Sequence, residues 1–107
     1  MKTFFAGLPE IEEQRAQSGK PYREFLRVPA MSAGLYVLPA GGIDRQKPHR
    51  EDEVYYVLRG RARFTAGSED REVSAGSVIF VAAQVEHRFY DITEELAVLV
   101  MFAPAET

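Results

Sequence analysis

The sequence contains no cysteine among its 107 residues. Without cysteine the chain cannot form a disulfide, bind a metal through thiolates or use a cysteine nucleophile. Any metal must therefore be held by nitrogen and oxygen atoms. The absence of disulfides also fits a reducing compartment, so we expect a cytoplasmic protein.

The sequence also lacks a basic block, a long apolar run and a signal peptide. Its 13 Lys and Arg residues are scattered among 16 Asp and Glu, whereas a nucleic-acid-binding face gathers basic side chains against phosphates. No apolar stretch reaches the roughly 18 residues that a membrane-spanning helix requires. The N-terminal segment MKTFFAGLPEIEE is too acidic for a signal peptide. We expect neither a nucleic-acid partner nor a membrane.

What the chain does have is enough apolar sequence for one core. Hydrophobic residues make up 46% and charged residues 27%, which is typical of a globular protein. A chain of this length forms one domain. We expect residues 1–107 to be that domain, with residues 1–30 as an N-terminal arm and residues 31–102 as the main body.

One short helix and a series of short strands are predicted. A helix over Pro9–Gln17 is favoured because Pro9 suits a helix start, acidic residues follow it and Gly19 can end it. From Lys20 onward, runs rich in Val, Tyr, Phe and Ile alternate with Gly, Pro, Asp or Ser, which is typical of an all-β sandwich or barrel. The predicted strands are Tyr22–Val28, Ser32–Leu38, Gln46–His49, Glu53–Leu58, Arg61–Ala66, Arg71–Val73, Val78–Val81, His87–Asp91 and Glu95–Phe102. Tight hairpin turns are expected at Arg59-Gly60 and at Gly67–Asp70.

The stretch Gly41–Gly60 concentrates the side chains best suited to chemistry. Alternate residues of an extended segment point to the same face. The residues that share one face here are Lys47, His49, Glu51, Glu53, Tyr55 and Val57. The chain has only two histidines, and the second, His87, lies in a similar segment that follows a glycine-led apolar run.

The spacing within this stretch resembles the first motif of the cupin family, G-x5-H-x-H-x3-E-x6-G. Gly41, His49, Glu53 and Gly60 stand at their motif positions. Lys47 stands where the motif has its first histidine. The stretch therefore keeps every spacing of the motif and departs from it in one residue type.

A second segment resembles the other cupin motif, G-x5-P-x-G-x2-H-x3-N. Gly76 and His87 keep their motif positions, while Ala82, Gln84 and Asp91 replace the proline, glycine and asparagine. Together the two motifs resemble those of a small single-domain cupin, a monocupin of the cupin-2 type. This resemblance implies an all-β fold, the double-stranded β-helix or jelly-roll barrel, here with a short N-terminal helix.

The resemblance further implies that His49, Glu53 and His87 bind a divalent metal. Two imidazoles and a carboxylate are a recognised ligand set for Fe(II), and they also suit Mn, Co, Ni or Zn. Each residue has a structural alternative as well. His49 would then be a turn histidine capped by Asp52, Glu53 a solvated strand acid, and His87 a rim residue hydrogen-bonded to Asp91.

Lys47 is open to three interpretations, because an ammonium group has no lone pair with which to bind a metal. Its side chain turns away from the site; or it pairs with Glu53 or Glu51 and replaces the metal cation; or it acts as a general acid or base beside the metal. In the third case Lys47 is a catalytic residue.

Six side chains are candidates for lining a pocket beside the metal, although an aromatic residue in a small barrel is more often part of the core. They are Phe25, Tyr36, Tyr55, Phe64, Phe89 and Met101. Tyr55 shares strand parity with Glu53, so it is a second candidate catalytic residue.

Two functions from different classes fit this sequence. The first is a metal-dependent enzyme, a dioxygenase, isomerase or lyase, which acts on a small oxygenated molecule that the metal polarises. The second is a non-catalytic module that binds a small molecule or a metal. We also expect a homodimer, because exposed sheet edges favour pairing between subunits. Phe4–Ala6 and Tyr22–Val28 are the segments predicted to exchange or to form the interface.

Overall fold

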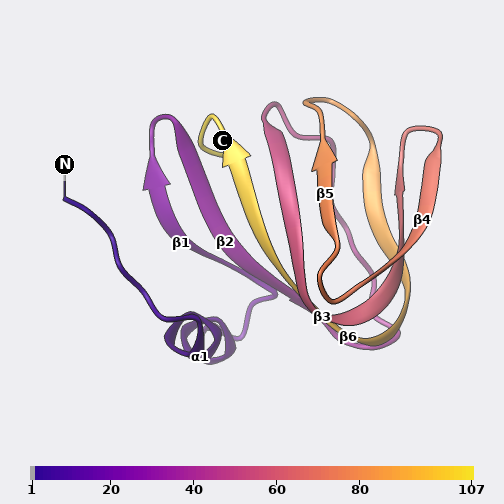
Figure 1. Ribbon diagram of the computed structural model, residues 1–107, viewed down its shortest axis with the longest axis horizontal. Coiled ribbons are helices and arrows are strands. Elements are labelled where there is room, and N and C mark those ends of the chain that lie inside the picture. The colour runs from indigo at the N-terminus through magenta and orange to yellow at the C-terminus, as the bar shows by residue number, and fades with distance from the viewer. Residues whose placement is uncertain (1) are drawn as a thin grey trace.

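A computed structural model describes residues 2–107 as one α-helix and a six-stranded antiparallel sheet (Figure 1). The elements are α1 (Leu8–Ser18), β1 (Tyr22–Val28), β2 (Met31–Leu38), β3 (Asp52–Ala66), β4 (Glu69–Ser74), β5 (Val78–Val81) and β6 (His87–Ala103). The strand order is β1-β2-β6-β3-β4, and β5 pairs with β3 beside β4. The all-β prediction is confirmed. The pairing leaves β1 at one edge and β4 and β5 at the other, so closure of the sheet into a barrel stays a prediction.

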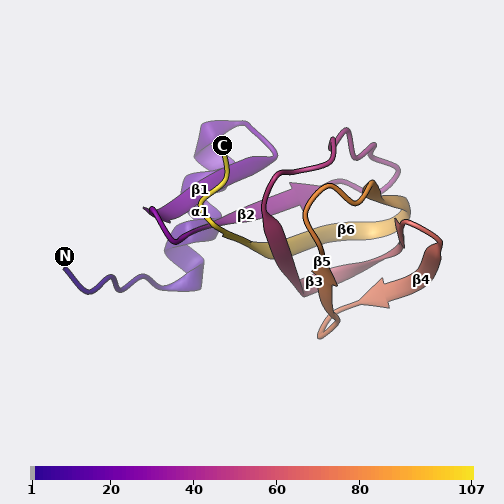
Figure 2. The same ribbon diagram turned by 90° about the horizontal axis from the view of Figure 1, so that it is seen from above.

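Two long strands replace four of the predicted short ones. β3 joins the predicted strands on both sides of Gly60, and β6 joins the predicted strands His87–Asp91 and Glu95–Phe102. The hairpin expected at Arg59-Gly60 is therefore wrong, whereas the turn after Ala66 is confirmed. Gly60 has a positive φ of 100°, and the register between β3 and β6 shifts on both sides of it. These irregularities bend the two strands instead of reversing the chain, as Figures 1 and 2 show.

The strand predicted at Gln46–His49 is also wrong, because these residues lie in the loop between β2 and β3. Pro48 has no backbone N–H to donate to a neighbouring strand, and the N–H of Gln46 is bonded to the side chain of Asp44. Strand parity therefore does not extend to Lys47. In the N-terminal arm, Phe4–Ala6 belongs to no strand of this chain.

Alternating side chains give the sheet two faces. We call the face that carries Glu53, Tyr55 and Val57 the inner face, and all three residues are buried. The larger hydrophobic core lies on it. Its members include Leu38, Tyr55, Val57, Phe64, Phe89, Leu96, Val98, Val100 and Phe102.

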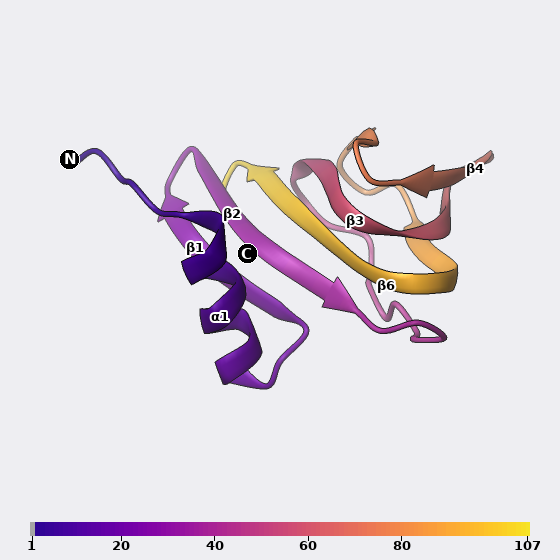
Figure 3. The same ribbon diagram turned by 60° about the horizontal axis from the view of Figure 1, so that its bottom comes forward.

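Helix α1 covers part of the opposite, outer face (Figure 3). Its single buried residue, Ile11, joins Leu35, Val37 and Ala97 in a second, smaller core. Gly19 ends the helix in a left-handed conformation, as the sequence predicted. Within residues 2–107, no helix is long and apolar enough to cross a membrane.

Candidate metal centre

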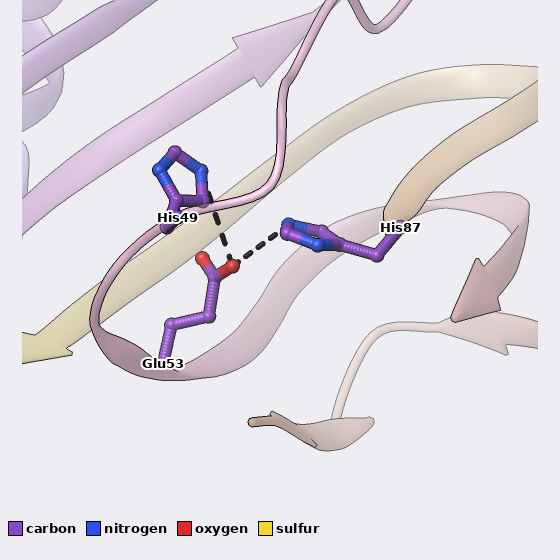
Figure 4. A group of neighbouring side chains, drawn as sticks. All are labelled: His49, Glu53 and His87. Atoms are coloured by element: carbon purple, nitrogen blue, oxygen red, sulfur yellow. Dashed lines mark ion pairs between the residues drawn. The ribbon is translucent and has the colours of Figure 1, made fainter. Parts of the chain in front are cut away.

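Three side chains from separate segments meet on the inner face. His49 comes from the loop before β3, Glu53 from the start of β3 and His87 from the start of β6, and their side chains point toward one another (Figure 4). One ligand atom from each residue lies within 4.8 Å of the other two. His87 Nε2 is 2.7 Å from Glu53 Oε1, and His49 Nε2 is 4.0 Å from the same oxygen. The structure thus brings together the three residues that the motif spacing singled out.

Backbone hydrogen bonds hold the segments that carry Glu53 and His49 in place. Glu53 lies between two neighbouring strands, opposite Phe102 of β6 and Val81 of β5. The backbone carbonyl of His49 accepts a 2.7 Å hydrogen bond from the N–H of Gln84, which links the loop to the segment before β6. Glu53 is therefore held by the sheet itself, and the loop that carries His49 is anchored to the segment before β6.

The contact between Glu53 and His87 is almost fully buried, with 2% and 3% of the two residues exposed. Burial acts to lower the pKa of His87, but the hydrogen bonds that its ring donates to Glu53 and to the Val85 carbonyl outweigh burial and raise it. The other carboxylate oxygen, Glu53 Oε2, is buried and has no hydrogen-bond partner. The two structural alternatives for these residues, a solvated acid and a histidine bonded to Asp91, are wrong.

The ring of His87 is oriented for binding through Nε2. Its Nδ1 lies 2.8 Å from the carbonyl oxygen of Val85, and that acceptor requires the proton to be on Nδ1. Loss of the second proton would leave a lone pair on Nε2, which faces Glu53. A backbone acceptor behind a metal-binding histidine is the usual arrangement in metal sites.

His49 has a comparable partner behind its ring, which we did not predict from the sequence. Its Nδ1 lies 3.4 Å from Glu106 Oε2. Glu106 is held by a hydrogen bond of 2.9 Å from its N–H to Ser32 Oγ, and burial raises the pKa of its carboxyl group. His49 and Glu106 are far apart in the sequence, so no local spacing connects them.

Tyr55 and Lys47, the two candidate catalytic residues, lie in opposite environments. Tyr55 is buried, its hydroxyl lies 3.1 Å from His87 Nε2, and burial raises the pKa of the phenol well above its usual value. Lys47 is exposed and lies outside the cluster. Glu53 pairs instead with His87, and this placement favours the hypothesis that Lys47 turns away.

A cavity of about 240 Å³ opens beside His49. Its apolar walls are Tyr22, Tyr36, Val100 and Phe102, and its polar lining includes Gln46 and His49. Among the six predicted pocket residues, Tyr36 alone lines this cavity. Tyr55, Phe64 and Phe89 pack in the main core, Phe25 packs against the smaller core, and Met101 lines a different cavity.

Sequence reasoning also missed a polar network that joins the cluster to the loop. Asp44 is buried, with 6% exposed, and its carboxylate accepts hydrogen bonds from Tyr36, Gln46 and the backbone of Phe89. Nothing in its spacing separates Asp44 from an ordinary solvated loop acid. Asp44 meets the backbone N–H of Phe89 only because the fold brings β6 beside the loop that carries Asp44.

Comparison with known proteins gives the same fold and a full-length relative. A family model described as a cupin domain matches residues 34–103. The chain is 50% identical, over the whole length of both proteins, to the uncharacterized protein SCO3923 of Streptomyces coelicolor.

Two solved structures share the fold at low identity. An RmlC-like cupin from Shewanella frigidimarina has a TM-score of 0.72 at 20% identity, with 78% of this chain and 75% of that chain covered. The DMSP lyase DddQ from Ruegeria pomeroyi has a TM-score of 0.69 at 20% identity, with 82% of this chain and 49% of that chain covered. This chain therefore spans about half the length of the lyase.

Proposed function

The chain belongs to the cupin family, and from that premise we propose that it binds one divalent metal ion through His49, Glu53 and His87. The observation that carries the proposal is the convergence of two imidazoles and a carboxylate within 4.8 Å, with Glu53 and His87 buried and His49 partly buried. The buried, unpartnered oxygen of Glu53 supports it, because such a polar atom is costly unless it gains a partner. These nitrogen and oxygen donors fit Fe, Mn, Ni, Co or Zn.

We further propose that the protein is a metal-dependent enzyme acting on a small oxygenated molecule, in the dioxygenase, isomerase or lyase class. The metal, when bound, supplies Lewis acidity that polarises a substrate oxygen. The cavity beside His49 supports this proposal, because its apolar walls can exclude water around a small ligand. Tyr55 keeps its phenolic proton, so it can donate a hydrogen bond within the site. The lyase with the same fold provides a precedent.

Metal content tests the metal-binding proposal directly. Protein purified without a nickel column should contain about one metal ion per chain by elemental analysis. Replacing His87 with Ala should remove a ligand and lower that content to near zero. Glu51→Gln is a matched control, because Glu51 is buried and accepts hydrogen bonds from Thr107 but lies outside the cluster.

The contrary result is a wild-type protein that holds no metal and whose melting temperature does not rise with added Mn²⁺, Co²⁺, Ni²⁺ or Zn²⁺. A bound metal raises stability by mass action. The absence of both metal and thermal shift would therefore exclude the metal site.

The second candidate function is a non-catalytic module that binds a small molecule or a metal. The observation in its favour is the ion pair between His87 and Glu53, in which a protonated His87 neutralises the Glu53 carboxylate without a metal. Binding of small ligands in the cavity by the metal-free protein, or binding without turnover by the metal-loaded protein, would support this function over the enzyme.

We also propose that the protein is a homodimer. The support is an uncovered apolar strip on the outer face, formed by Tyr56, Val78 and Phe80. A cytoplasmic location and the absence of a nucleic-acid partner stay predictions from composition.

A further inference from the structure

Gln46, the residue before the motif position held by Lys47, turns its side chain into the cluster. Its Oε1 lies 3.1 Å from His49 Nε2. The same oxygen accepts a 2.9 Å hydrogen bond from the hydroxyl of Tyr55, which in turn lies 3.1 Å from His87 Nε2. Gln46 is therefore in contact with one proposed ligand directly and with another through a single side chain.

The orientation of the Gln46 amide is set by Asp44. Gln46 Nε2 donates a 3.0 Å hydrogen bond to Asp44 Oδ2, and an ionised carboxylate only accepts hydrogen bonds. A flipped amide would place its carbonyl oxygen against that carboxylate. The amide nitrogen must therefore face Asp44, and the carbonyl oxygen must face His49.

Asp44 is in turn fixed by the sheet. Its Oδ1 accepts a 2.7 Å hydrogen bond from Tyr36, and its Oδ2 accepts one of 2.9 Å from the backbone N–H of Phe89 in β6. The carboxylate is buried and fully bonded, so it is a rigid support. The position of Gln46 Oε1 is thus set by two strands.

We propose that the side-chain carbonyl oxygen of Gln46 is a fourth protein ligand for the metal. This inference rests on the proposed metal site of His49, Glu53 and His87. An amide oxygen has lone pairs and no charge, and carbonyl oxygens are ordinary ligands of divalent metals. The ammonium of Lys47 offers no lone pair, and Lys47 is exposed. Gln46 would thus supply, from the adjacent residue, a fourth donor atom that Lys47 does not offer.

Co²⁺ binding tests this assignment, because cobalt absorption reports the number and type of ligands. Affinity is measured by competition with a chelator, alongside the visible spectrum of the Co²⁺-loaded protein. Gln46→Met keeps the side-chain length and removes the oxygen. We expect it to lower Co²⁺ affinity about ten- to a hundredfold or more and to change the visible spectrum. Gln46→Ala should behave in the same way, so that a folding defect in one variant leaves the other as a test.

Two further variants separate coordination from packing. Gln46→Glu restores an oxygen donor, but its second carboxylate oxygen replaces the amide nitrogen that donates to Asp44. We therefore expect it to bind Co²⁺ more tightly than Gln46→Met and less tightly than the wild type. Lys47→Ala is the matched control from the adjacent position, and it should change neither the affinity nor the spectrum. Circular dichroism establishes that each variant is folded.

The outcomes separate this inference from the proposed function. If the wild type binds Co²⁺ and a folded Gln46→Met binds it with the same affinity and spectrum, Gln46 is not a ligand and the three-residue site still stands. If the wild type binds no Co²⁺, Mn²⁺, Ni²⁺ or Zn²⁺, the metal site itself is wrong and Gln46 has no metal to bind. Loss of affinity in Lys47→Ala together with wild-type behaviour in Gln46→Met would assign the fourth position to Lys47.

Discussion

At the scale of single residues, the buried contact between His87 and Glu53 links protonation to the stability of the metal-free protein. Burial opposes the charge on His87, but the hydrogen bonds to Glu53 and Val85 raise its pKa above the ordinary value of 6.5. A raised pKa in the folded state gives stability that is fully present below about pH 6.5 and is lost as pH rises through the folded-state pKa.

We therefore predict that the free energy of unfolding of the metal-free protein falls as pH rises above about 6.5. Each unit by which the pKa is raised corresponds to about 1.4 kcal/mol. This fall is measured by urea unfolding at a series of pH values from about 5.5 to about 8.5, with a strong chelator present. His87→Gln removes the titrating group and should flatten the profile. Equal pH profiles for the variant and the wild type would show that His87 does not carry the effect.

The residue scale also shows which parts of the site the sequence can predict. His49, Glu53 and His87 are found because motif spacing singles out rare residue types, and the structure brings them together. Their role as metal ligands stays a prediction. Gln46 and Asp44 could not be found in this way, because amide and acid side chains are common in loops. Asp44 finds its partners Tyr36 and Phe89 only because β2 and β6 lie beside the loop, and Asp44 in turn orients Gln46.

At the scale of elements, the bend in β3 depends on Gly60. Gly60 has a φ of 100°, and a Cβ atom there would overlap the carbonyl oxygen of Glu95 and lie 2.7 Å from the Cα of Leu96. Both of these are backbone atoms of β6, so they cannot move without disturbing the pairing of β3 with β6. A side chain at this position would force the two longest strands apart.

We predict that Gly60→Ala destabilises the protein by about 3 kcal/mol or more, through the combined cost of the left-handed backbone and the overlap. Gly41→Ala is the matched control. Gly41 also has a positive φ, 74°, but a Cβ there would have no neighbour within 4 Å. It should cost only about 1 kcal/mol. Chemical denaturation measures both values, and an equal loss in the two variants would contradict the role given to the close approach.

The same glycine explains why the strand boundaries were mispredicted. A glycine between two short β-type runs is the usual sign of a tight turn, and the sequence of Arg59-Gly60 does not distinguish a turn from a bulge. The difference lies in β6, whose backbone passes close to Gly60. The turn after Ala66 was predicted correctly because β4 pairs directly with the preceding residues of β3. Local sequence thus predicts a turn correctly when the two strands joined by that turn pair with each other. It does not predict the conformation at Gly60, because that conformation depends on β6, which is distant in the sequence.

At the scale of the whole molecule, one part of the outer face remains uncovered. Helix α1 covers the β1 and β2 side (Figure 3), but the side formed by β3 and β5 has no covering element among residues 2–107. The register places Val78 opposite Tyr56 and Phe80 opposite Val54, and Val78 and Phe80 are 69% and 64% exposed. Neighbouring apolar side chains of this size on an open sheet face are typical of an interaction site. The second copy in the proposed homodimer would cover them.

We predict that the wild-type protein is a dimer by size-exclusion chromatography with light scattering and that Phe80→Glu weakens the dimer at least a hundredfold. A charge buried in an apolar interface without a partner is costly, whereas the same charge on an exposed side chain of a monomer costs little. Ala40→Glu, which adds the same charge at the exposed turn after β2, should leave the dimer intact. A wild-type monomer at high micromolar concentration would exclude the homodimer. A Phe80→Glu protein that remains dimeric would place the interface elsewhere, at the edge strand β1 or the arm that carries Phe4–Ala6.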